Sequence, residues 1–362
     1  MNLVARTNAR LAAVRLRMEK ADLPALLVSQ ITNIRWLTGF TGTNGFVLLT
    51  QTDALFATDS RYVEQAKSQV HGFVHHLLPT SAPEEVTAIL EKAGASRIGF
   101  EAESVNCALY RKYREKLPPA IDLVPTEGIV DGLRMVKDAV EIEKTQAACR
   151  IADNAFDHIL AYIKPGANER DVMLELEWFM RKERRADVAF DTIVASGPRS
   201  ALPHGRAAER VMEVGDFVTL DFGAKLDGYN SDITRTVVLG EPTTEQRKVY
   251  QIVLDALRIS IDAIRPGAQG KVVDAIGRDF IAHAGYGDYF GHGLGHSLGL
   301  NVHDGPGLSK TSEVTLANGM IITVEPGIYI PDWGGVRIED DVVVNDDSPR
   351  VLTTSPRDLI SL

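Results

Sequence analysis

The chain has 362 residues, of which 44% are hydrophobic and 24% are charged, and its formal net charge is −10. This length exceeds what one hydrophobic core ordinarily supports and indicates two domains, and no apolar run approaches the ~18 residues of a membrane span. The negative charge argues against nucleic acid or an anionic membrane as the main partner. Two cysteines, Cys107 and Cys149, stand in no paired motif, which favours the reducing environment of the cytoplasm.

The first part of the chain alternates helix and strand signals. Residues 1–20 are rich in arginine, as in a transit peptide, but Leu11, Val14 and Met18 recur at helical spacing and favour an amphipathic helix. Further helices are expected at 62–70 and 82–93, and strands at 25–29, 45–50, 54–58, 73–77, 97–100 and 121–124. This alternation predicts an α/β domain with a partly parallel sheet.

A turn-rich stretch at 125–132 marks the expected boundary, which gives domains at 1–130 and 131–362. A long helix follows, with Asp138 as N-cap and Glu141 at the capping-box position, and it continues to about Tyr162. The second domain contains an internal repeat, because Ile-Lys-Pro-Gly-Ala at 163–167 matches Ile-Arg-Pro-Gly-Ala at 264–268, 101 residues later. The repeat predicts two related α+β halves about a pseudo-twofold axis, with a site between them.

The most unusual stretch runs from Gly291 to Asp304 and contains three of the nine histidines, His292, His296 and His303, interleaved with glycines. Glycine at this density disfavours a helix and lets the backbone approach a bound group closely. We therefore expect these histidines on a loop or at a strand end.

Two pairs of acidic residues are placed at strand ends, one pair in each half. In the first half, Asp227-Gly228 is a strong hairpin turn, which would set Asp221 opposite Thr234 with Asp232 as its diagonal neighbour. In the second half, a buried strand at 320–324 ends at Glu325, and residues 335–339 bring Glu339 back across the turn at 331–334. Carboxylates placed side by side repel each other unless a proton or a cation lies between them.

Four carboxylates and one imidazole make a ligand set that suits two divalent cations such as manganese, cobalt or zinc. Two such ions about 3.5–4 Å apart can hold a bridging hydroxide that is nucleophilic at neutral pH. The reaction class is therefore hydrolysis of an amide or a phosphate ester. The sequence has no phosphate-cradling glycine motif, which favours the amide.

Six motifs occur in order along the second domain, at 220–223, 231–236, 291–296, 302–304, 325–329 and 337–340. Together they closely resemble the proline-specific metallopeptidases of the pita-bread fold, the Xaa-Pro aminopeptidases and Xaa-Pro dipeptidases (prolidases). The stretches 33–40 and 58–62 resemble the creatinase-type N-terminal domain of that family. The resemblance implies an α/β N-terminal domain plus an α+β C-terminal pita-bread domain with an internal pseudo-twofold duplication.

The resemblance also implies a set of metal ligands. Asp221 would bind one ion, Asp232 and Glu339 would bridge the two, and His296 and Glu325 would bind on the side of the second ion. The ions would be two per chain, with manganese expected and cobalt or zinc as alternatives. The substrates would be small peptides with proline at the second position, and the protein would be a cytoplasmic homodimer with no nucleic-acid or membrane partner.

Further residues receive catalytic roles through the same resemblance. Glu325 would pass a proton from the attacking water towards the leaving nitrogen, and His303 would steady the oxyanion or the proton movement. His292 and His204 would line the pocket, and Arg337 would orient carboxylates. Small departures from the family pattern are Asp304, where glutamate is common, and Gly205-Arg206 after His204, which could alter the pocket rim.

The choice between aminopeptidase and dipeptidase stays open at this stage. A dipeptidase needs a group that captures the substrate's C-terminal carboxylate or a wall that blocks longer chains, and Arg206, Arg61 and Arg35 are candidates for such a clamp. Non-catalytic pita-bread binding modules and creatinase-like enzymes would lack part of the ligand set, and methionine aminopeptidases normally lack an N-terminal domain of this type.

Overall fold

The computed structural model describes residues 3–79 and 83–362, so Met1, Asn2 and Ala82 of the predicted helices lie outside the described residues. These residues form two compact units, one ending at Arg134 and the other beginning at Met135. The domain boundary placed after residue 130 stays a prediction. Within the described ranges, no helix combines the length and apolar character needed to cross a bilayer.

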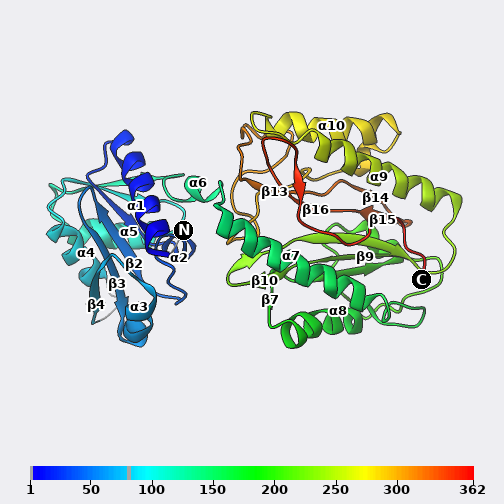
Figure 1. Ribbon diagram of the computed structural model, residues 1–362, viewed down its shortest axis with the longest axis horizontal. Helices are drawn as coiled ribbons and strands as arrows, with labels where there is room; N and C mark the ends of the chain where they lie inside the picture. The colour runs from blue at the N-terminus through cyan, green and yellow to red at the C-terminus, as the bar shows by residue number, and fades with distance from the viewer. Residues whose placement is uncertain (1–2, 80–82) are drawn as a thin grey trace. The chain divides into compact units, whose positions relative to one another are not determined.

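The first unit is an α/β domain around a six-stranded sheet, as predicted (Figure 1). Its strand order is β4-β3-β2-β1-β5-β6, with parallel pairs β1–β5, β5–β6 and β3–β4 and antiparallel pairs β1–β2 and β2–β3. The strands are β1 Ala25–Val28, β2 Phe46–Thr50, β3 Ala54–Asp59, β4 Val74–Leu78, β5 Arg97–Glu101 and β6 Asp122–Thr126. The helices are α1 Leu3–Lys20, α2 Ile31–Thr38, α3 Val63–Gln69, α4 Pro83–Lys92, α5 Cys107–Lys116 and α6 Asp131–Arg134.

Helix α1 buries Leu11, Val14 and Met18, which confirms the amphipathic helix. Helices α2 and α5 were not expected from the sequence. Helix α2 is short and ends at Gly39, whose φ of 81° places it in the left-handed region. Such a glycine ends a helix without the penalty that a side chain would bring, but it is also typical of turns.

The second unit has its helices in pairs, each pair followed by strands. Helix α7 Ala139–Ile159 begins at Asp138, whose side chain and that of Glu141 form the predicted capping box, and it ends slightly before Tyr162. The remaining helices are α8 Glu169–Trp178, α9 Thr244–Asp262 and α10 Gly270–His283, with a π-helical turn η2 at Phe179–Glu183 and 3-10 turns η3 Gly197–Ala201 and η4 Gly287–Tyr289. The strands are β7 Asp187–Val188, β8 Ile193–Ser196, β9 Phe217–Phe222, β10 Ala224–Leu226, β11 Tyr229–Asn230, β12 Ile233–Val238, β13 Ile321–Val324, β14 Gly327–Ile330, β15 Gly334–Arg337, β16 Asp340–Val343 and β17 Arg350–Val351.

The internal duplication is visible in the main-chain hydrogen bonds that fix the start of α8 and of α10. The amide-to-carbonyl bonds run from Gly166 to Met212, Met212 to Ala167, Glu169 to Arg210 and Arg170 to Ala208 in the first half, and from Gly267 to Leu316, Leu316 to Ala268, Gly270 to Val314 and Lys271 to Ser312 in the second. The repeated Pro-Gly-Ala sequence therefore marks equivalent structural positions, which confirms the predicted pair of halves.

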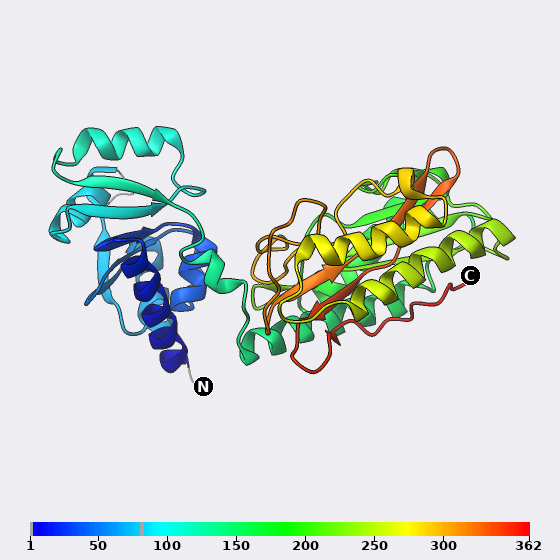
Figure 2. The same cartoon turned by 90° about the horizontal axis from the view of Figure 1, so that it is seen from above.

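Each half has its own hydrophobic core. One core joins α7 and α8 to β8, β9 and β12, and the other joins α9 and α10 to the strands β13–β16. In Figure 1, α9 and α10 lie at the top of this unit and α8 at the bottom, with strands of both halves between them. Figure 2, seen from above, shows α9 and α10 side by side along the strands. This arrangement directs the strand ends of the two halves towards a shared interior.

Candidate active site

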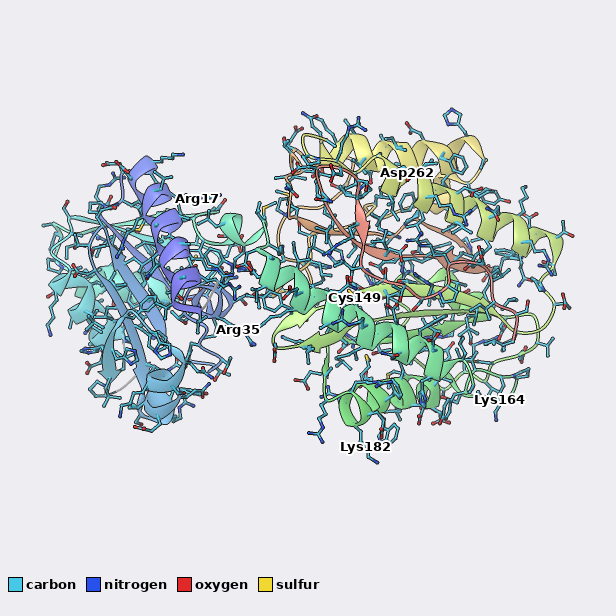
Figure 3. All side chains as sticks on the ribbon, in the orientation of Figure 1. Arg17, Arg35, Cys149, Lys164, Lys182 and Asp262 are labelled. Atoms are coloured by element: carbon cyan, nitrogen blue, oxygen red, sulfur yellow. The ribbon has the colours of Figure 1, made fainter. Side chains whose placement is uncertain are left out.

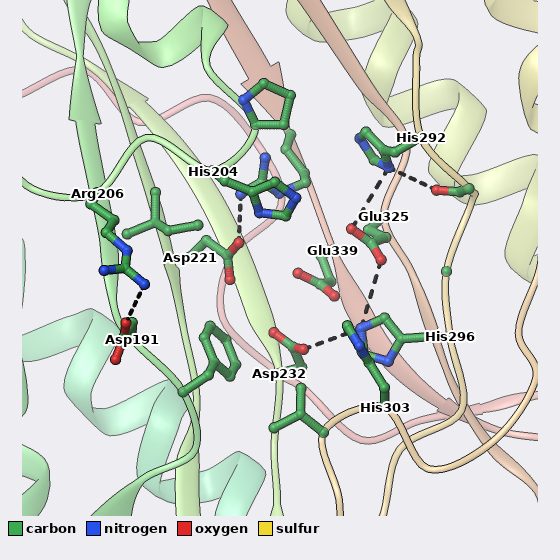
Figure 4. A pocket seen from close by; sticks show the side chains of 17 residues that line it. Asp191, His204, Arg206, Asp221, Asp232, His292, His296, His303, Glu325 and Glu339 are labelled. Carbon is green, nitrogen blue, oxygen red and sulfur yellow. Dashed lines mark hydrogen bonds and ion pairs between the residues drawn. The ribbon is translucent and has the colours of Figure 1, made fainter. Parts of the chain in front are cut away.

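A cavity of about 660 Å³ opens in the second unit and contains all nine predicted site residues (Figure 4). Its lining includes His204, Asp221, Asp232, His292, His296, His303, Glu325, Arg337 and Glu339. These side chains come from both halves of the duplication. Residues far apart in the sequence therefore meet in one pocket.

The first pair of acids is placed by the hairpin of β9 and β12. Asp221 lies opposite Thr234 in this antiparallel pair, as predicted. Asp227 and Gly228 have φ values of 50° and 84°, which two-residue hairpin turns require at both central positions. Asp232 precedes β12 directly, so this turn brings it beside Asp221.

The second pair of acids is placed by strands β13 and β16, which pair antiparallel with Val324 opposite Asp340. Glu325 follows the first of these residues and Glu339 precedes the second, so the two acids adjoin. The predicted return at 331–334 is the hairpin of β14 and β15. Thr234 connects the halves, because its hydroxyl donates to Glu339 Oε2 at 2.6 Å and its carbonyl accepts from the Glu339 amide at 3.1 Å.

The tightest cluster in the cavity consists of Asp232, His296 and Glu339, whose ligand atoms all lie within 4.8 Å of one another. His296 Nε2 is 3.4 Å from Asp232 Oδ2 and 3.8 Å from Glu325 Oε1. Asp221 is held slightly apart from this cluster, since its Oδ2 accepts a hydrogen bond from Arg337 Nη2 at 2.6 Å.

Burial makes the ionised form of these acids costly. It raises the pKa of Asp232 and Glu339 well above their ordinary values, and the neighbouring carboxylates raise both further. The pKa of Glu325 is also raised, mainly by burial. Asp232 Oδ1 is buried and accepts no hydrogen bond from any described residue. A divalent cation would satisfy this oxygen and offset the repulsion, so the residues present fit metal ions.

A chain of hydrogen bonds links Asp221 to His292 through Arg337 and Tyr329. The Arg337 guanidinium donates from Nη1 to the Tyr329 hydroxyl at 2.8 Å, and this hydroxyl lies 2.8 Å from His292 Nε2. His292 Nδ1 lies 2.7 Å from the Gly293 carbonyl. Because the Tyr329 oxygen accepts from Arg337, its own proton is free for His292 Nε2, and Nδ1–H donates to the carbonyl. Burial lowers the pKa of His292 to about 4, so the ring is neutral at pH 7.

Two residues of the site have roles that the sequence analysis did not identify. Tyr329 stood in a quoted motif without a role, although its place four residues after Glu325 is a signal in retrospect. Asp341 lies just after the motif at 337–340. Its Oδ2 accepts from the Asp232 amide at 2.9 Å and from the Cys149 thiol at 3.3 Å. Burial raises the pKa of Asp341 to about 7, and Cys149 lies on α7 (Figure 3).

The histidines of the 291–304 stretch lie outside any helix, as expected. The rings of His296 and His303 meet edge to face with centroids 4.3 Å apart. Burial lowers the pKa of the half-buried His303, and no described residue hydrogen-bonds to its ring. The glycines of this stretch were expected to let the backbone approach a bound group, and one of them also has a different role. A Cβ on Gly295 would lie 1.9 Å from the Thr323 carbonyl oxygen, so this glycine admits the protein's own strand β13 as well as lining the cavity.

The candidate clamp arginines lie in different places. Arg206 lines the cavity and pairs with Asp191, Nη2 to Oδ2 at 2.7 Å. Arg61 belongs to the first unit and pairs with Asp59 at 2.8 Å, and Arg35 lies on α2 of the same unit. Of the three, Arg206 is the one placed in the cavity by the structure.

The sequence matches metallopeptidase family M24 over residues 143–346 and the creatinase/prolidase N-terminal domain over residues 10–136. The chain belongs to metallopeptidase family M24. It is 36% identical to the Xaa-Pro dipeptidase of Pyrococcus horikoshii over 95% of this chain and 96% of that protein. Membership of M24 implies the use of divalent metal, in agreement with the buried acids.

Solved structures show the same architecture for this M24 peptidase. The Xaa-Pro dipeptidase from Bacillus anthracis superposes with a TM-score of 0.95 at 44% identity, covering 98% of this chain and 100% of that one. The X-Pro aminopeptidase from Thermotoga maritima gives 0.88 at 38% identity, with 96% and 100% covered. The M24 peptidase therefore has the pita-bread fold predicted from the motifs.

Proposed function

We propose that this metallopeptidase hydrolyses the peptide bond preceding proline in short peptides. The observation that carries the proposal is the convergence of four carboxylates and His296 in one cavity, with Asp232 Oδ1 buried and unsatisfied among the described residues. The relatives named above act on Xaa-Pro substrates according to their names, and they match nearly the full chain. We assign the metal ligands as Asp221, Asp232, His296, Glu325 and Glu339, holding two divalent ions.

The bound ions would polarise the scissile carbonyl and make water nucleophilic at neutral pH. Glu325 accepts the proton of the attacking water and delivers it to the leaving proline nitrogen, a role that suits a carboxylate lining the cavity beside the proposed ions. His303 donates to the oxyanion, since its ring has no hydrogen-bond partner among the described residues. These assignments give proton transfer to Glu325 and charge stabilisation to His303.

The remaining predicted residues hold or shape the cavity. Arg337 fixes the position of Asp221 through its 2.6 Å hydrogen bond and fixes Tyr329 through a second one. Both nitrogens of His292 are engaged within the protein, so this histidine presents its ring, as a wall for the proline side of the substrate. His204 lines the opposite, first-half part of the cavity.

The proposal also covers the identity of the metal, the cellular location and the oligomeric state. We assign manganese as the ion, with cobalt or zinc as alternatives, because the ligands are mostly carboxylate oxygens. A cytoplasmic homodimer is proposed from the family resemblance, and both described cysteines are free. The relatives carry the names dipeptidase and aminopeptidase, so the subclass is left to experiment.

The test is hydrolysis of Ala-Pro and Ala-Pro-Ala with manganese, before and after chelation. We expect metal-dependent release of alanine from at least one of the two peptides. Cleavage of the dipeptide alone would assign a dipeptidase, and cleavage of the tripeptide would assign an aminopeptidase. If neither peptide is cleaved in a metal-dependent manner, the proposed function is wrong.

A further inference from the structure

Arg206 is an exposed cation on the wall of a cavity that is otherwise dominated by acids. The other arginine of the lining, Arg337, is buried and bonded to Asp221. We propose that Arg206 binds the C-terminal carboxylate of the peptide substrate and so selects short peptides with a free carboxyl end. This inference rests on the proposed function and deepens it by naming the substrate feature that is recognised.

The sheet places Arg206 at a defined distance from the proposed metal ligands. Ile193 on β8 pairs with Asp221 on β9 and forms an isolated bridge with Arg206 on its other side. Neighbouring strands lie about 4.8 Å apart, so the backbones of Asp221 and Arg206 are separated by roughly 10 Å. Directly opposed residues point to the same face of a sheet, and all three line the same cavity.

This separation matches the length of a short peptide. An extended chain advances about 3.3–3.6 Å per residue. In a dipeptide, the carboxyl carbon of the proline therefore lies one such step beyond the carbonyl carbon of the scissile bond. In a tripeptide, the carboxyl carbon of the third residue lies two steps beyond it. The flexible Arg206 side chain can span the remainder of the roughly 10 Å. The carboxylate of a dipeptide and that of a tripeptide share this chemistry, and the experiment separates them.

The present partner of Arg206 is easily exchanged. The side chains of Arg206 and Asp191 are 79% and 75% exposed, and an ion pair in such a setting contributes little. A substrate carboxylate can therefore replace Asp191 at the guanidinium, which presents two parallel N–H groups to a carboxylate. Figure 4 shows the pair at the edge of the site, away from the other labelled acids.

Charge on the rest of the wall supports the same placement. Asp221, Asp232, Glu325 and Glu339 gather in the interior, where an additional carboxylate would be repelled unless it bound the ions directly. A substrate whose amide bond occupies the interior would keep its own carboxylate away from these acids. Arg206 offers the favourable partner at that end of the cavity.

The experiment compares R206Q and D191N with the wild type on Ala-Pro, Ala-Pro-Ala and the C-terminally amidated forms of both, in the presence of manganese. R265Q is the matched control, because it removes the same charge from an exposed arginine outside the cavity. We expect R206Q to raise KM for a free-carboxylate peptide about 10-fold or more, with kcat little changed. D191N should lower that KM, since it removes the competing carboxylate. The amides and R265Q should show no such changes.

The peptide that responds identifies the source of the carboxylate. A response confined to Ala-Pro assigns Arg206 to the dipeptide, and one confined to Ala-Pro-Ala assigns it to the tripeptide. The inference is overturned if R206Q still prefers peptides with a free carboxylate over their amides, or if the wild type shows no such preference. In either case, hydrolysis of the amides would still uphold the proposed function. If no peptide is hydrolysed, both fall together.

Discussion

The two halves of the catalytic unit share a scaffold and differ in what their loops deliver. Each half fixes the start of its second helix by the same four main-chain hydrogen bonds, and each carries two acids in or beside its strands, Asp221 and Asp232 in one half and Glu325 and Glu339 in the other. The two halves therefore each contribute two carboxylates to the cavity.

The loops distinguish the two halves. In the second half the segment between α10 and β13 carries His292, His296 and His303, whereas in the first half the segment between β8 and β9 carries His204 and Arg206. The imidazole of the proposed metal site thus comes from one half and the exposed cation of the rim from the other. The acids beside the strands therefore supply the carboxylates of the site, and the loops supply its imidazoles and the exposed cation of the rim.

The largest effect is expected from substitutions that test whether the two halves contribute equally to metal binding. D232N and E339Q each remove a proposed bridging carboxylate, one from each half. Each should lower kcat/KM more than about 100-fold, beyond the 10–100-fold effect of losing an outer-shell group, and should reduce the number of bound ions measured by elemental analysis.

The control for these variants is D340N. Asp340 is the buried neighbour of Glu339, but it accepts from Arg235 Nη2 at 2.9 Å and from the Thr353 hydroxyl at 2.7 Å instead of lining the cavity. Its replacement should lower stability without changing the metal content. Full activity in D232N or E339Q would contradict the bridging assignment for that half.

The next effect concerns metal removal and pH. Unfolded aspartate and glutamate lose their protons near their ordinary pKa values of 3.8 and 4.5, whereas burial raises the pKa of Asp232 and Glu339 well above these and that of Asp341 to about 7. Without cations the folded state therefore keeps protons that the unfolded state has released, and its stability falls as pH rises from about 4.

Bound cations reverse this penalty because they favour the ionised carboxylates. The difference in melting temperature between manganese-loaded and chelator-treated protein should thus widen from pH 5 to pH 7, as measured by scanning calorimetry. A difference that narrows over this range would show that the buried acids are not the metal ligands.

Much of the site could be predicted because its geometry is set by local sequence. The Asp227-Gly228 turn fixes the register that puts Asp221 opposite Thr234, and the strand before Glu325 consists entirely of β-branched residues, which favour strands. Once the turn and the strands are known, the positions of the acids follow from the two-residue period of a strand.

The parts that were missed depend on contacts between distant segments. Asp341 bonds to the amide of Asp232 and the thiol of Cys149, and nothing near any of these residues in the sequence announces the others. The same holds for the hydrogen bond between Thr234 and Glu339 that joins the halves. Helix α2 was missed for a different reason, because four of its eight residues are β-branched, and such residues favour strands over helices.

The smallest expected effect tests the shared scaffold itself, at the two glycines of the repeated Pro-Gly-Ala sequence. Gly166 and Gly267 have φ values of 89° and 86°, and a Cβ at either position would meet no atom within 4 Å. The change to alanine therefore acts through backbone strain alone, which should destabilise each variant by about 1–2 kcal/mol. Equal losses for G166A and G267A in denaturant unfolding would establish that the halves use the position alike. By contrast, G295A should lose far more, because its Cβ would collide with the Thr323 carbonyl. A loss in only one of the matched pair would mean that the repeat shares sequence there without sharing its energetic role.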